Sequence, residues 1–141
     1  MTEKFVWTPE YSVGVELIDE QHRGFFSIAN GILELARQNA VSQEEVLKHL
    51  GQLGDYAMYH LGTEEQYFDE FHYPEAPAHV AVHDEFRETI EKYLDDAQHP
   101  DDTDLVKLSE AAAKSAGEWL MRHIKEMDQR YVECFHQHGL K

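Results

Sequence analysis

Ten histidines stand out in this 141-residue chain, and several of them recur at the spacing of one helical turn. His60 precedes Glu64 by four residues, and His79 precedes His83 by the same interval. Side chains at i and i+4 lie on one face of a helix, so each pair could direct two donor atoms at one point. Imidazole nitrogens and carboxylate oxygens both coordinate metal ions. The two pairs are therefore candidate parts of a metal site.

Two other segments could complete such a site. His22 lies on the apolar stripe of the first predicted helix. His123 and Asp128 are five residues apart, which separates them by about 140° around a helix of 3.6 residues per turn. A short carboxylate one turn beyond a ligand can still reach a neighbouring metal. All four predicted helices therefore send nitrogen donors towards one axis.

The joint pattern carries more weight than any single residue in it. A histidine taken alone is more often a hydrogen-bonded core or surface residue, and an exposed His/Glu pair is usually solvated. Burying all these groups in one core, however, would cost several kcal/mol for each uncompensated group. A bound metal offsets that cost. We therefore predict a metal site formed by His22, His60, Glu64, His79, His83, His123 and Asp128.

The types of the donors restrict the metal. Neutral imidazoles with carboxylates and no thiolate disfavour Cu(I) and structural zinc–thiolate sites. The donors also outnumber what one tetrahedral zinc ion would use. If both carboxylates bridge two octahedral ions, a few positions are left for solvent and for a small ligand. Iron or manganese fits such a mixed nitrogen and oxygen site with two ions.

The elements that must position these residues are helices. Apolar residues recur at three- and four-residue intervals and predict helices over about residues 19–38, 43–71, 76–97 and 104–135. Asp19 is the expected N-cap of the first helix. An irregular N-terminal arm, about residues 1–18, precedes them and holds the only strand-like alternation. Because the joins are short, we expect one all-α domain over residues 1–141, an up-down-up-down four-helix bundle.

The composition excludes several classes of partner. The 12 Lys and Arg residues against 28 Asp and Glu give a net charge of −16, which argues against nucleic acid and anionic lipid as partners. No apolar run approaches the roughly 20 residues of a membrane span, and the N-terminus lacks the layout of a signal peptide. The single cysteine, Cys134, excludes an internal disulfide and suits a reducing compartment. We expect a cytoplasmic protein, with a monomer favoured.

Several polar residues have no predicted role in the site. We expect Glu65 to be solvated and Cys134 to be a buried or half-buried thiol. Five histidines lack a partner at ligand spacing and are expected at the surface: His49, His72, His99, His136 and His138.

The order and spacing of the motifs resemble the hemerythrins, specifically the single-domain bacterial hemerythrins. The resemblance covers nearly the whole chain: Trp7, Val13-Gly14-Val15, Ile18-Asp19-Glu20-Gln21-His22, His60-x3-Glu64, Tyr73-Pro74, His79-x3-His83 and Trp119-Leu120-x2-His123-x4-Asp128-x2-Tyr131. One departure is Leu61, where an aromatic residue commonly follows the histidine of the second helix. It removes no ligand.

This resemblance implies a non-haem di-iron centre that binds dioxygen reversibly. It assigns three histidines to one iron, namely His79, His83 and His123. It assigns His22 and His60 to the other iron, which keeps a vacant position. Glu64 and Asp128 would bridge the two ions together with a solvent-derived oxygen. Leu120 and Trp119 resemble the residues that shield the oxygen pocket in the family.

The implied role is transport, storage or local supply of O2 rather than catalysis. One alternative is a di-iron enzyme acting on peroxide or nitric oxide, or an oxidase. The carboxylate-rich di-iron enzymes use two Glu-x-x-His motifs, whereas this chain has one, Glu133-Cys134-Phe135-His136, in its tail. Another alternative is an O2 or redox sensor that works with a separate partner protein.

Overall fold

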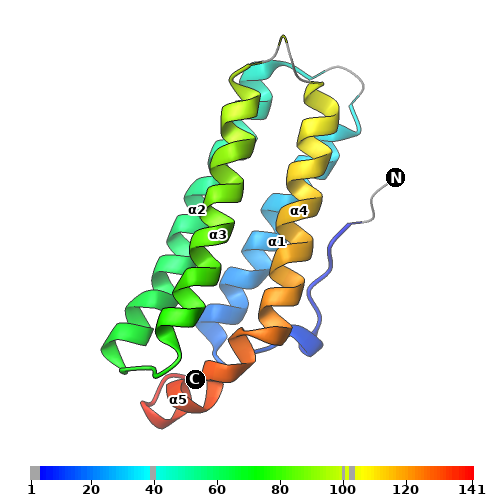
Figure 1. The fold of residues 1–141 in the computed structure, drawn as a ribbon. Helices are drawn as coiled ribbons and strands as arrows, with labels where there is room; N and C mark the ends of the chain where they lie inside the picture. Colours follow the sequence, from blue (N-terminus) through cyan, green and yellow to red (C-terminus); the bar gives the residue numbers. More distant parts are fainter. Residues whose placement is uncertain (1–3, 39–40, 100, 102–103) are drawn as a thin grey trace.

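Four long helices lie side by side in the computed structural model, which describes residues 4–38, 41–99, 101 and 104–141 (Figure 1). These helices are α1 (Glu16–Ala36), α2 (Gln43–Glu70), α3 (Ala76–Ala97) and α4 (Leu105–Glu126). Three short elements complete the chain: the 3-10 turns η1 (Pro9–Tyr11) and η3 (Asp128–Tyr131), and helix α5 (Val132–Gln137). The described residues contain no strand. The predicted all-α, up-down-up-down bundle is confirmed.

Each long helix directs an apolar stripe at the bundle axis. Phe25, Leu53, Ile124 and Leu120 are all at most 2% exposed. Burying a side chain of this size contributes about 1.5–3 kcal/mol, so these stripes supply the main drive for packing. Within the described ranges, no helix is both long and apolar enough to cross a membrane.

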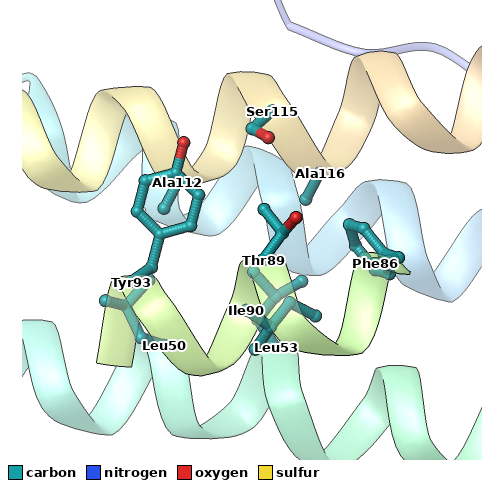
Figure 2. Close-up of a pocket in the computed structure, with 9 residues that line it drawn as sticks. All are labelled: Leu50, Leu53, Phe86, Thr89, Ile90, Tyr93, Ala112, Ser115 and Ala116. Atoms are coloured by element: carbon teal, nitrogen blue, oxygen red, sulfur yellow. The ribbon is translucent and has the colours of Figure 1, made fainter. Parts of the chain in front are cut away.

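In the half of the bundle away from the α2–α3 connection, the core contains a small apolar pocket (Figure 2). Leu50 and Leu53 of α2, Phe86 and Ile90 of α3, and Ala116 of α4 are among its lining residues. The centre of a water-sized sphere can occupy only about 10 Å³ of it. This part of the bundle is therefore nearly filled.

Helix α1 begins earlier than the sequence pattern predicts. Its first residue is Glu16, so Asp19 is not the N-cap. The Asp19 carboxylate instead accepts hydrogen bonds from the backbone N–H of Val13, at 2.8 Å, and from the hydroxyl of Ser12, at 2.6 Å. Asp19 thus fastens the arm to the first turn of α1. The spacing of residues along the sequence could not predict this contact, because it forms only when the arm folds back against α1.

The predicted fourth helix, 104–135, is interrupted rather than continuous. Helix α4 ends at Glu126, Met127 departs from helical geometry at φ −114°, and η3 begins at Asp128. On an uninterrupted helix Asp128 would lie about 140° around the axis from His123. The change of winding lets the Asp128 side chain turn inward, where it is fully buried.

The N-terminal arm packs along the outside of the bundle (Figure 1). The side chain of Asn30 on α1 accepts a hydrogen bond from the backbone N–H of Phe5, at 2.7 Å, and donates one to its carbonyl, at 2.8 Å. The Phe5 ring lies so close to Gly117 of α4 that a Cβ there would overlap it. Gly117 therefore makes room for the arm.

We predict that Gly117→Ala destabilises the fold by about 1–3 kcal/mol, because the added methyl group overpacks the Phe5 ring. Gly51→Ala is the matched control: a Cβ at Gly51 meets nothing within 4 Å, so it should stabilise the helix by roughly 0.5–1 kcal/mol. Urea unfolding followed by circular dichroism measures both changes. Equal stabilisation by the two substitutions would contradict this packing of the arm.

Candidate metal centre

The predicted site residues converge near one end of the bundle, where the α2–α3 connection and α5 lie (Figure 1). Every long helix contributes at least one of them. In chain order they come from α1, α2, α3, α4 and η3: His22, His60, Glu64, His79, His83, His123 and Asp128. None is more than 3% exposed. The fold thus brings together, inside the core, all the residues that the spacing singled out.

Their donor atoms fall into two overlapping groups, in each of which the atoms lie within 4.8 Å of one another. One group joins three histidines to both carboxylates: His79, His83, His123, Glu64 and Asp128. The other joins the same two carboxylates to His22 and His60. Because the carboxylates are common to both groups, the arrangement could hold two neighbouring metal ions.

The nitrogens of the three-histidine group face one another. Nε2 of His123 lies 3.0 Å from Nε2 of His79 and 3.1 Å from Nε2 of His83. Two ligands at right angles, each about 2.1 Å from a metal, are about 3.0 Å apart. The spacing of these nitrogens therefore fits three ligands of one octahedral ion.

The two carboxylates each face both groups. Asp128 places Oδ1 3.1 Å from Nε2 of His79 and Oδ2 3.3 Å from Nε2 of His22. Glu64 places Oε1 3.6 Å from Nε2 of His60 and 3.4 Å from Nε2 of His83. Asp128 thus turns one carboxylate oxygen towards each group, whereas Glu64 turns the same oxygen, Oε1, towards both.

Among the described residues, several polar atoms in this cluster have a close charged neighbour but no hydrogen bond. They include Nε2 of His22, Nε2 of His60, Oε1 of Glu64 and both carboxylate oxygens of Asp128. A buried polar atom without a partner costs about 1–3 kcal/mol. Metal coordination would satisfy these atoms together, so the donor set fits a bound metal better than it fits an ordinary core.

Burial and charge set the protonation states of the cluster. Burial lowers the pKa of His60 to about 4, so its ring is neutral at pH 7. Burial also opposes a charge on His83, but the adjacent carboxylates of Glu64 and Glu65 outweigh it and raise the pKa of His83 to about 9. Burial disfavours an ionised Asp128, yet the neighbouring histidines hold its pKa well below the ordinary value. The carboxylate charge is thus balanced by protonated histidine, which a metal cation can replace.

Three partners of the cluster lie just outside it, and the sequence pattern did not assign them. Nδ1 of His83 lies 2.7 Å from Oε2 of Glu65, and Nδ1 of His60 lies 2.8 Å from Oε1 of Gln21. The hydroxyl of Tyr131 donates to Oε2 of Glu64 at 2.5 Å. The expectation that Glu65 is solvated is therefore wrong. The signal that could have predicted this contact is Arg87, which lies one helical turn after His83 and pairs with Glu65.

Apolar and aromatic groups surround the cluster. Leu120 is fully buried, whereas Trp119 is half-buried and stacks on the ring of His123 with centroids 4.3 Å apart. Phe86 stacks on the indole of Trp119 at 4.1 Å. Leu61, which departs from the family pattern, is fully buried. Aromatic rings thus lie against part of the cluster, beside its polar partners Gln21, Glu65 and Tyr131.

The remaining histidines lie outside this cluster. His72, His99 and His138 are exposed, and His49 is half-buried with Nδ1 2.8 Å from the carbonyl oxygen of its own helix at Glu45. His136 is half-buried too, with Nε2 2.8 Å from the carbonyl oxygen of Gly14. His136 therefore helps to hold the arm. Cys134 is half-buried, as expected.

Comparison with known families gives a match over most of the chain. Residues 13–135 match the family described as the hemerythrin HHE cation binding domain. The bacteriohemerythrin of Clostridium acetobutylicum is 26% identical over 132 residues, which cover 92% of this chain and 99% of that protein. The myohemerythrin of Theromyzon tessulatum is 31% identical over 129 residues, 92% of each chain.

Solved structures give the same fold. A crystal structure of wild-type hemerythrin superposes with a TM-score of 0.83 at 24% identity, covering 94% of this chain and 98% of that one. A crystal structure of a hemerythrin point mutant superposes with a TM-score of 0.81 at 24% identity, over 92% of this chain and 95% of that one.

We predict that a divalent metal, added to the metal-free protein at about pH 7.5, releases about one proton from His83. With a pKa near 9 this ring is protonated at that pH and must lose the proton from Nε2 to bind metal. His60, with a pKa near 4, is already neutral and releases none. The release should therefore fade as the pH rises through 9.

Calorimetric titration with Co²⁺ in two buffers of different ionisation enthalpy, without oxygen, measures this proton. The heats should differ between the buffers at about pH 7.5 and converge at about pH 10. Identical heats at the lower pH would contradict the protonation state assigned to His83.

Proposed function

The chain belongs to the hemerythrin family, and from this premise we propose that it binds dioxygen reversibly at a non-haem di-iron centre. The observation that carries the proposal is the sharing of Glu64 and Asp128 by two adjacent donor groups. A site for one ion would not need two groups, and a site without iron or a similar metal would leave the donors unpaired.

We assign the ligands according to the two groups. His79, His83 and His123 would hold one iron, and Glu64 and Asp128 would be shared with the other, together with a solvent-derived oxygen. His22 and His60 hold the second iron. Because its group has one histidine fewer, the second iron would keep a position open to a small ligand. When bound, the iron pair supplies reversible electron transfer to O2.

The protein side chains keep that chemistry reversible. We assign Leu120, which is fully buried, and Trp119, which stacks on His123, to the apolar lining of the oxygen pocket. Their apolar surfaces exclude water, which disfavours the escape of charged products and the entry of protons. Burial raises the pKa of the Tyr131 hydroxyl well above its ordinary value. That hydroxyl therefore keeps its proton and holds Glu64 in one orientation.

We propose O2 transport, storage or local supply, without enzymatic turnover, as the role of the protein. The donor set supports this, because its five imidazoles outnumber its two carboxylates, unlike the carboxylate-rich sets of the di-iron enzymes. The single free cysteine, Cys134, supports a reducing, cytoplasmic setting. The net charge of −16 supports a monomer through self-repulsion.

Anaerobic titration of the iron-loaded protein with O2 tests the proposal. We expect a change in the visible spectrum that saturates near one O2 per two irons and reverses when O2 is removed. Irreversible oxidation, or repeated turnover with peroxide or nitric oxide, would instead identify an enzyme. A protein that binds O2 only with a separate partner bound would identify a sensor.

Variants give the matched control for this titration. Glu64→Ala and His79→Ala should lose most of the iron and the spectral change, because each leaves a set of buried donors incomplete. His49→Ala should behave like the wild type, since the His49 ring bonds only to the backbone of its own helix. Circular dichroism checks that each variant folds. Equal iron loss in all three would contradict the ligand assignment.

A further inference from the structure

His83 uses its two ring nitrogens in opposite directions. Nε2 faces the three-histidine donor group, 3.1 Å from Nε2 of His123. Nδ1 faces outward and lies 2.7 Å from Oε2 of Glu65. A carboxylate only accepts hydrogen bonds, so Nδ1 keeps its hydrogen, and the proton that His83 loses on metal binding comes from Nε2, whose lone pair then faces the metal. Glu65 thereby selects the tautomer that a ligand needs.

Arg87 holds the Glu65 carboxylate in place. Its guanidinium places Nη2 3.0 Å from Oε1 and Nη1 2.9 Å from Oε2 of Glu65. Such a two-pronged pair fixes the plane of a carboxylate as well as its position. Arg87 also donates to Asp84 at 2.8 Å, so part of its positive charge is offset there. The Glu65 side chain, 24% exposed, is thus oriented from both sides.

The corresponding contact in the two-histidine group carries no charge. Nδ1 of His60 lies 2.8 Å from the amide oxygen of Gln21. The Gln21 amide donates in turn to the Thr63 hydroxyl, at 3.3 Å, and Gln21 is only 3% exposed. Nδ1 of His22 has no partner among the described residues. The outward hydrogen bonds of the two groups therefore differ in charge.

This difference acts on the electron density of the rings. A hydrogen bond from imidazole to a carboxylate makes the imidazole a stronger donor than one to a neutral amide. A stronger donor stabilises the more oxidised state of the metal that it binds. A negative partner on His83 alone would thus make one ion of the pair easier to oxidise than the other.

We propose that Glu65, oriented by Arg87, is a positioning residue that lowers the reduction potential of the three-histidine iron and so strengthens O2 binding at the neighbouring ion. This inference rests on the proposed di-iron function and identifies Glu65 as a residue that controls its O2 affinity. Glu65 touches neither iron nor O2, and it acts through His83.

A purely structural role would have a different signature. Glu65 also ties α2 to α3, through His83 and Arg87. Glu65→Gln has almost the same shape and keeps an oxygen that can accept from Nδ1, but it removes the charge. A structural tie predicts a change in stability and little change in potential. The charge effect predicts a change in potential in a protein that still holds its iron.

The experiment compares wild type, Glu65→Gln and Glu65→Asp as full-length, iron-loaded protein, with Glu70→Gln of the exposed surface of α2 as control. Redox titration without oxygen measures the reduction potential of the iron centre, and O2 titration measures its affinity for O2. Glu65→Gln should weaken O2 binding about tenfold and raise the potential by about 59 mV, the equivalent of tenfold for one electron. Glu65→Asp keeps the charge and should stay closer to the wild type.

A Glu65→Gln potential equal to those of wild type and Glu70→Gln would overturn the proposal. If Glu65→Gln retains too little iron, zinc-loaded protein labelled with ¹⁵N replaces it. The Nδ1 proton of His83 should then move upfield in the variant, and an unchanged resonance would refute the charged hydrogen bond. Because the potential is measured without O2, a wild type that holds two irons but binds no O2 would defeat the proposed function and leave this test intact.

Discussion

The burial of charge-bearing donors around one point is the constraint on which the rest of this structure depends. Five imidazoles and two carboxylates lie inside the bundle, and none of them is more than 3% exposed. In the part of the chain that the structure describes, several of their atoms have no hydrogen-bond partner, and each such atom works against folding. The apolar stripes of the helices supply the packing energy. The polar cluster fixes how the helices must face one another, because every long helix carries part of it.

The helices meet this constraint in different ways. On α2 and α3 an ordinary helical turn suffices, because His60 with Glu64, and His79 with His83, already share a face. At the end of α4 a regular helix would not suffice, so the chain departs from it at Met127 and turns Asp128 inward. Tyr131, in the same short turn, then reaches Glu64. The local irregularity thus places both a donor and the side chain that orients its counterpart.

This contrast explains how much could be predicted from the sequence. Helical periodicity is a local property, so the four helices and the two i,i+4 pairs are readable from spacing alone. The start of α1 at Glu16 is not, because it depends on the arm folding back to hydrogen-bond with Asp19. The prediction that Glu65 is solvated was also wrong, since its partners His83 and Arg87 lie on another helix. The convergence of the donors could be predicted, but the individual hydrogen bonds between elements could not.

Two metal ions with unequal surroundings would share Glu64 and Asp128. Anomalous diffraction at the iron edge, on crystals of the iron-loaded protein, tests it most directly. We predict two iron peaks about 3.5–4 Å apart, one among His79, His83 and His123 and the other beside His22 and His60. A single peak, or iron bound away from these residues, would contradict the account.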